Sequence, residues 1–319
     1  MLFCGIDTSN YTTSAALCDA DGNVKANLRR LLRVKEGERG LRQSDAVFEH
    51  VRNLPEIMKG IGEAIDDEVV AVGVSRTPRT ADGSYMPCFL CGIAAAEAFA
   101  AGRGIPVFGF SHQQGHVMAA YSMSGAAGRI GTDKFIAFHV SGGTTELLLV
   151  NPADDFSVEL IGGTEDLNAG QAIDRTGVAM GMKFPCGPEM ERRALVFVGK
   201  IPVRKASVKG LGCNLSGLEN IAAGMLRAGT ETAAVCAFVF DYVGETLEKL
   251  TLNARKKYGD MPVVYAGGVM SNSIIRRRLS AAGDVYFTEP CYSADNAVGT
   301  ALLCRKRYFE NEPSATGKN

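Results

Sequence analysis

Apolar positions recur along the chain with two periods, one typical of strands and the other of helices. Residues 44–65 have a helical spacing, which predicts an amphipathic helix whose apolar face carries Val47, Phe48, Val51, Leu54, Met58 and Ile61. Short apolar runs predict strands at 69–74 and 105–110, and the small-residue segment 91–102 predicts a helix between them. Strands that alternate with helices in this way indicate the α/β class.

Two stretches far apart in the chain repeat one plan. Residues 1–32 and 135–161 each contain an apolar strand, a tight segment rich in Gly, Ser or Thr, a second strand and an acidic turn. Such internal similarity predicts a duplicated fold with two related lobes. Further on, an apolar strand and a Gly pair precede a helix expected from about Ser271, and a last helix is expected from about Ser293.

Composition narrows the class of protein and of partner. The 319 residues are 46% hydrophobic, and their net charge of -1 gives no reason to expect a partner bound by bulk electrostatics. Any polyanion must be held locally. The first residues lack a basic segment before an apolar run, and no uncharged stretch reaches the roughly 18 residues of a membrane span. Nine scattered cysteines suit a reducing compartment, so a cytoplasmic protein without a membrane partner is expected.

The candidate chemistry begins with two histidines four positions apart. Ser111 and Gln114 fit a capping box, which starts a helix with His112 and His116 on one face. From spacing alone, both imidazoles can meet one metal ion, or both can line a lobe interface as ordinary polar side chains. A zincin-type peptidase needs Glu directly after its first His, and this chain has Gln113 there.

Two hairpin loops are candidate phosphate sites. Backbone N–H groups and hydroxyls of "DTSNYTTS" and "SGGTTE" can form a concave anion site, and the strand-end acid Asp7, with Ser9 beside it, is the candidate for catalysis. In "AGGVMSN", Asn272 can bond a base or ribose, although a plain strand-to-helix turn explains the segment equally well. Cys88 and Cys91 are expected to be buried small hydrophobic residues rather than a reactive or metal-binding pair.

Taken in order, seven segments resemble the glycoprotease family, which includes the TsaD-type subunits that transfer threonylcarbamoyl groups to tRNA. The segments are "GIDTS", "HQQGH", "VSGGTTELLLV", "NAGQAIDRTGVAMGMKFPCGPE", "LSGLEN", "AGGVMSN" and "SADNAVGTALL". The resemblance implies a duplicated actin-like ATPase (ASKHA) fold with a ligand cleft between two lobes. The N-terminal lobe is expected at 1–130, with a C-terminal helix at 296–311 packing back on it. The C-terminal lobe is expected at 131–295, followed by a flexible tail at 312–319.

The resemblance also assigns roles to residues. His112 and His116 are implied to ligate one divalent metal together with Asp295, a set that suits iron or zinc. The loop around the phosphate and carbonyl of an adenine nucleotide or threonylcarbamoyl-AMP is implied to be Val140, Ser141, Gly142, Gly143 and Thr144. The nucleoside-contacting positions are implied to be Asp174, Gly187 and Asn272. The implied acceptor is tRNA, and the implied protein partners are a paralogous subunit of the transfer complex or a second copy of the chain.

Departures from the family pattern fall around the implied substrate. Thr144 stands where His is usual, Glu219 stands where Lys is usual, Asp7 replaces the common Glu, and residues 75–87 replace a Gly- and Pro-rich stretch. These changes suggest a divergent paralogue, and they leave the metal residues intact. The leading hypothesis is a carbamoyl-type transferase that acts on tRNA. Its alternatives are transfer to another acceptor, a non-catalytic nucleotide-binding regulatory partner and, least favoured, a metallopeptidase.

Overall fold

The computed structural model describes residues 1–9, 11–33, 41–202 and 204–311, and the chain divides into two compact units. Unit 1 contains Met1–Ser122, Asp154–Val158 and the chain from Ala294 onward; unit 2 contains Met123–Ala153 and Glu159–Ser293. The tail at 312–319, which was expected to be flexible, lies outside the described residues.

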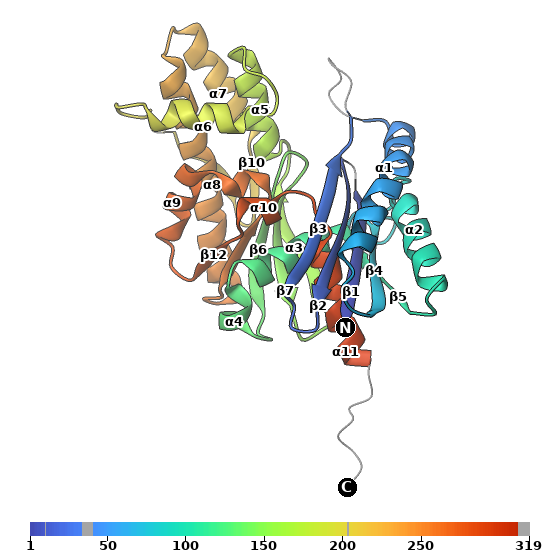
Figure 1. The fold of residues 1–319 in the computed structure, drawn as a ribbon. Helices are drawn as coiled ribbons and strands as arrows, with labels where there is room; N and C mark the ends of the chain where they lie inside the picture. Colours follow the sequence, from blue (N-terminus) through green and yellow to red (C-terminus); the bar gives the residue numbers. More distant parts are fainter. Residues whose placement is uncertain (10, 34–40, 203, 312–319) are drawn as a thin grey trace. The chain divides into compact units, whose positions relative to one another are not determined.

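Unit 1 is built on a five-stranded sheet with the order β3-β2-β1-β4-β5 (Figure 1). Its strands are β1 (Leu2–Ser9), β2 (Thr12–Asp19), β3 (Val24–Leu31), β4 (Val69–Thr77) and β5 (Val107–Ser111). The first three form an antiparallel meander, whereas β4 runs parallel to β1 and β5 runs parallel to β4. The predicted acidic turn joins β2 to β3, where the Asp19 carboxylate accepts the backbone N–H groups of Asp21 and Asn23.

Helices cover both faces of this sheet, and every residue of β1 is therefore buried. On one face, Leu2, Cys4 and Ile6 share a core with α1 (Gln43–Ala64) and α2 (Phe89–Ala101), so both predicted helices are confirmed. The predicted apolar face of α1 is wrong in part, because Phe48 and Val51 are more than half exposed. On the other face lies α11 (Val298–Asn311). The backbone of Ala301 in this helix and of Ala297 just before it leaves no room for a side chain at position 5 of β1.

The last helix begins later than the sequence pattern suggests. A four-residue helix, α10 (Pro290–Ser293), ends where the long helix was expected to begin, and α11 starts only at Val298. Asn296 accounts for the delay because its Oδ1 accepts the N–H of Val298 at 3.0 Å and its Nδ2 donates to the carbonyl of Ala294 at 2.7 Å. Residues 294–297 are therefore held as a non-helical segment.

The sheet of unit 2 repeats the sheet of unit 1. Its order is β12-β11-β6-β7-β8-β10-β9, so β8-β7-β6-β11-β12 correspond to β3-β2-β1-β4-β5. The pairing directions agree where they can be compared: β6 is antiparallel to β7, and β11 is parallel to both β6 and β12. The predicted duplication is confirmed. The strands are β6 (Phe135–Val140), β7 (Thr145–Asn151), β8 (Ser157–Thr164), β9 (Ser207–Lys209), β10 (Gly212–Asn214), β11 (Val263–Ala266) and β12 (Val285–Phe287).

The core of unit 2 forms between this sheet and α8 (Thr232–Tyr258). Tyr265 of β11 stacks between Phe138 and Phe287, with ring centroids 5.0 Å away on each side, and its hydroxyl bonds Thr251 of α8 at 2.6 Å. Figure 1 shows further helices gathered at one end of the unit. They are α5 (Ala169–Ala179), α6 (Gly187–Leu195) and α7 (Ser216–Arg227); the remaining short helices are α4 (Ala126–Ile130) and α9 (Ser273–Ser280).

All nine cysteines are free thiols. Burial raises the pKa of Cys88 to about 12, and it raises the pKa of Cys91 as well. The prediction that this pair consists of buried small residues is confirmed. In the part of the chain that the structure describes, no helix is both long and apolar enough to cross a membrane.

Candidate metal centre

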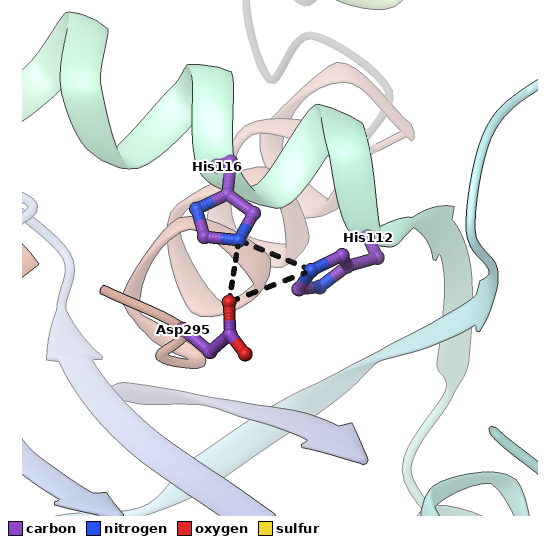
Figure 2. Close-up of side chains that lie close together, drawn as sticks. All are labelled: His112, His116 and Asp295. Carbon is purple, nitrogen blue, oxygen red and sulfur yellow. Dashed lines mark hydrogen bonds and ion pairs between the residues drawn. The ribbon is translucent and has the colours of Figure 1, made fainter. Parts of the chain in front are cut away.

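Three side chains from two distant segments converge in unit 1 (Figure 2). His112 and His116 come from α3 (His112–Met123), and Asp295 comes from the non-helical segment before α11. The Nε2 atom of His116 lies 3.1 Å from Nε2 of His112 and 3.1 Å from Oδ1 of Asp295. The third side of this triangle, from His112 Nε2 to Asp295 Oδ1, is 3.9 Å.

The capping box predicted from the sequence fixes the start of α3. Ser111 Oγ accepts the backbone N–H of Gln114 at 3.1 Å, and Gln114 Oε1 accepts the backbone N–H of Ser111 at 2.9 Å. The helix therefore begins with His112, and a spacing of four residues places His116 on the same face one turn later. The prediction that these two imidazoles share a face is confirmed.

Asp295 is held from two directions. Its neighbour Asn296 forms the bonds that delay α11, so the backbone of the segment is fixed. The hydroxyl of Thr12, at the start of β2, donates to Asp295 Oδ2 at 3.4 Å. This contact leaves Oδ1 directed at the histidines. Thr12 is a supporting residue that the sequence patterns did not single out; the hairpin pairing of Ser9 with Thr12 is the feature that brings it to this edge.

Asp7 contacts His112 at Nδ1, the ring nitrogen that does not face the other two side chains. Its Oδ1 lies 3.2 Å from Nδ1 of His112, and the Asp7 side chain is almost fully buried at 1% exposure. Burial alone would lower the pKa of His112, but the Asp7 carboxylate outweighs it and raises that pKa to about 9. Burial alone would raise the pKa of Asp7, and the imidazole beside it holds that pKa below its usual value.

The donor set fits a transition metal ion. The three ligand atoms lie within 4.8 Å of one another, and two imidazoles with one carboxylate suit zinc or ferrous iron. The contact from Asp7 to Nδ1 of His112 leaves Nε2 as the ligand atom, an arrangement typical of histidine ligands that are fixed by a second carboxylate. Helix α3 alone fixes the positions of the two imidazoles. Asp295 is the one ligand of the three that tertiary packing must bring to them.

We expect the substitution Asp7→Asn to lower metal affinity by about 10- to 100-fold, the usual cost of losing a partner that orients a ligand. Asparagine keeps the size of the side chain but removes the charge that holds the His112 ring. The measurement is competitive titration of zinc against a chelator. The matched control is Asp21→Asn, which changes an exposed carboxylate in the β2–β3 turn. Equal affinity in wild type and Asp7→Asn would show that Asp7 does not support the centre.

Ser9, the second candidate for catalysis, is buried at the end of β1, two residues after Asp7. Within the described residues its Oγ makes no hydrogen bond. Because alternate strand residues share a face, Ser9 lies on the same side of the sheet as Asp7.

In unit 2, the structure brings together two of the implied substrate segments. The Ser141 hydroxyl accepts the N–H groups of Gly143 and Thr144 at 3.2 Å each and bonds the Thr144 hydroxyl at 2.8 Å, so this turn is closed on itself. The flanking Val140 is buried, and Gly142 has open space where a side chain would start. Gly267 of "AGGVMSN" lies directly against the backbone of Val140, where a Cβ atom would be 2.3 Å from the carbonyl oxygen.

The remaining implied positions have local roles. A 3-10 turn over Gly268–Ser271 precedes α9, which therefore begins at Ser273, two residues later than expected. Asn272 caps α9 by accepting the N–H groups of Ile274 and Ile275. Asp174 Oδ1 accepts the N–H of Cys186 at 2.7 Å, directly before Gly187 at the start of α6. Burial raises the pKa of Asp174. Asp174 and Gly187 are therefore neighbours in space, as a shared ligand site requires.

Comparison with protein families gives one match that covers most of the chain. The family model described as "TsaD: tRNA N6-adenosine threonylcarbamoyltransferase" matches residues 40–302. A tRNA N6-adenosine threonylcarbamoyltransferase of Chlorobium luteolum is 26% identical over 326 aligned positions, which cover 95% of this chain and 92% of that protein.

Solved structures share the fold at low identity. Component A of the (R)-2-hydroxyglutaryl-CoA dehydratase of Acidaminococcus fermentans has a TM-score of 0.55 at 15% identity, covering 96% of this chain and 98% of its own. Full-length HypF has a TM-score of 0.61 at 14% identity, covering 98% of this chain and 56% of its own. A ROK family glucokinase of Streptomyces griseus has a TM-score of 0.51 at 13% identity, covering 96% and 100% respectively. These likenesses, with the repeated sheets, show the duplicated actin-like ATPase fold.

Proposed function

Because the chain belongs to the TsaD family of tRNA N6-adenosine threonylcarbamoyltransferases, we propose that it is a metal-dependent transferase that moves a threonylcarbamoyl group from threonylcarbamoyl-AMP to an adenosine of tRNA. The observation that carries the metal dependence is the convergence of His112, His116 and Asp295 within 4.8 Å. In this proposal the metal is iron or zinc, the protein works in the cytoplasm, and the reaction needs no covalent intermediate on the protein.

The proposed chemistry joins the exocyclic amine of the adenosine to the carbamoyl carbon of the adenylate, and AMP departs. The amine is a weak nucleophile, so the site must stabilise charge on the carbonyl oxygen or on the departing phosphate. A bound divalent metal supplies a Lewis acid for those oxygens. His112, His116 and Asp295 hold it, and Asp7 and Thr12 keep His112 and Asp295 in their orientations.

The nucleotide half of the substrate is assigned to unit 2. In this proposal, the open backbone at Gly142 and Gly143 approaches the phosphate and carbonyl groups, because a side chain at either position would meet nothing within 4 Å. Asp174 and Gly187 are the proposed nucleoside contacts. Asn272 uses its carbonyl oxygen to cap α9, which leaves its amide nitrogen to face the nucleoside.

A protein partner is part of the proposal. Phe48 and Val51 on α1 and Leu90 on α2 are all more than half exposed. A protein that docked here would remove this apolar surface from water. The proposed partner is the paralogous subunit of the transfer complex, with a second copy of this chain as the alternative.

A different acceptor is the second candidate function. Glu219 stands where the family usually has a lysine, and its carboxylate pairs with Arg175 at 3.2 Å. An acid in place of a base near the proposed substrate changes which acceptor is attracted. A non-catalytic role is disfavoured because the metal residues are intact, and a peptidase is disfavoured because Gln113 replaces the required glutamate base.

The test supplies threonylcarbamoyl-AMP, labelled in its threonine, to the metal-loaded protein together with unmodified tRNA. We expect label in tRNA with wild type and none with His116→Ala. A TsaD homologue of known activity, assayed in parallel, is the positive control. If that homologue labels tRNA and this protein does not, the tRNA assignment is wrong. Labelling of another acceptor under the same conditions would support the second candidate.

A further inference from the structure

The chain from Arg192 to Leu218 carries six basic residues and no acidic residue, although the whole protein has a net charge of -1. The six are Arg192, Arg193, Lys200, Arg204, Lys205 and Lys209. Arg192 and Arg193 form ion pairs with Glu189 on their own helix, so their positive charge is partly neutralised. The remaining cations follow α6, and they concentrate positive charge in one short part of unit 2.

Three of these cations lie on a loop that is fixed to the core. This loop, residues 196–206, joins α6 to β9, and we refer to its described residues as the basic strap. Phe197 and Ile201 pack on the hydrophobic core of unit 2, and Ala206 is buried in it. At the end of the strap, the N–H of Ala206 donates to Glu245 of α8 at 3.4 Å. The strap therefore has an anchored inner side.

The outer side of the basic strap is charged and apolar at once. Lys200, Arg204 and Lys205 are exposed, and within the described part of the chain none of the three takes part in an ion pair or a side-chain hydrogen bond. Val198 is 98% exposed and Val196 is 73% exposed. Free cations beside exposed apolar side chains on an anchored backbone are typical of a docking surface rather than of an ordinary solvated loop.

We propose that the basic strap docks the sugar-phosphate backbone of the RNA acceptor, with Lys200, Arg204 and Lys205 contacting phosphates and the valines lying against sugar or base faces. This inference rests on the proposed function for the identity of the polyanion. RNA is the occupant that the charge favours, because an acid-free cationic segment in a protein of near-zero net charge matches a polyanion held locally. A docked protein would need acidic residues in the same arrangement.

The test compares two triple variants of the full chain. The first carries Lys200→Ala, Arg204→Ala and Lys205→Ala; the control carries Lys256→Ala, Lys257→Ala and Arg277→Ala, which removes the same charge from exposed helix positions of the same unit. Binding of a fluorescently labelled, unmodified tRNA transcript is followed by anisotropy between about 50 and 200 mM salt, a range in which phosphate contacts dominate the salt response. Circular dichroism melting curves establish that each variant is folded.

We expect the strap variant to bind tRNA at least about tenfold more weakly than the control variant. We also expect its slope of log affinity against log salt to be smaller by about 2 to 3, since each lost phosphate contact removes roughly 0.9. Equal affinity and slope in the two variants would overturn the proposal, as would a strap variant that loses a protein partner but keeps tRNA. A wild type that binds tRNA through the strap and yet transfers no label would leave this inference standing and refute the proposed reaction.

Discussion

The substitution His116→Ala is expected to abolish stoichiometric metal binding, with a loss of affinity well above the roughly 100-fold that removal of a supporting residue costs. His116 lies at the centre of the site, because its Nε2 is 3.1 Å from both of the other ligand atoms. Without it, His112 and Asp295 present two donors whose nearest approach is 3.9 Å. The measurement is metal content after dialysis, together with the stabilisation produced by added zinc. At a zinc concentration about 100 times the dissociation constant, the free energy of unfolding of wild type should rise by roughly 2.7 kcal/mol. That of the variant should hardly change.

The control for this experiment is Cys291→Ser. Cys291 is the exposed thiol of the chain and lies four residues before Asp295, so it is the obvious source of adventitious zinc binding. We expect this variant to keep the metal. If His116→Ala retains one equivalent of metal while Cys291→Ser loses it, the assigned centre is wrong and the thiol holds the ion.

Local rules in the sequence predicted that the two histidines share one face of a helix, whereas their role as metal ligands came from the family resemblance. A capping box and a spacing of four residues depend only on neighbouring positions, and both are present in α3 as expected. Asp295 lies 179 residues beyond His116, and no periodicity connects the two. Its assignment came from the family resemblance, because a carboxylate in a non-helical segment is placed by tertiary packing and leaves no local pattern.

The same division holds for the fold. The two hairpins and their acidic turns are local features, and they predicted the duplication that the strand orders confirm. The strand orders themselves depend on parallel pairs between distant segments, such as β1 with β4, which hydrophobic pattern alone does not select. The starts of α9 and α11 were misplaced because asparagine caps at 272 and 296 compete with helix formation just before each helix.

A contact between two glycines explains how the distant carboxylate reaches the histidines. Gly115 of α3 lies between the two histidines in sequence, and Gly299 of α11 lies four residues after Asp295. A Cβ atom at position 299 would lie 1.8 Å from the carbonyl oxygen of Gly115 and 2.9 Å from the backbone nitrogen of Ala119. The two helix backbones therefore touch at this point. The distance between α3 and α11 at this contact therefore limits how far Asp295 lies from the two histidines.

We expect Gly299→Ala to destabilise the protein by on the order of 3 kcal/mol, because the methyl group meets backbone atoms that no rotamer change can move aside. The separation of α11 from α3 also pulls Asp295 away from the histidines, so zinc affinity falls in the protein that remains folded. Thermal melts and chelator competition measure the two effects. The control is Gly62→Ala in α1, where a Cβ atom meets nothing within 4 Å, and there alanine should be neutral or stabilising by up to about 1 kcal/mol. If Gly299→Ala matches Gly62→Ala in both measurements, the glycine contact does not set the geometry of the centre.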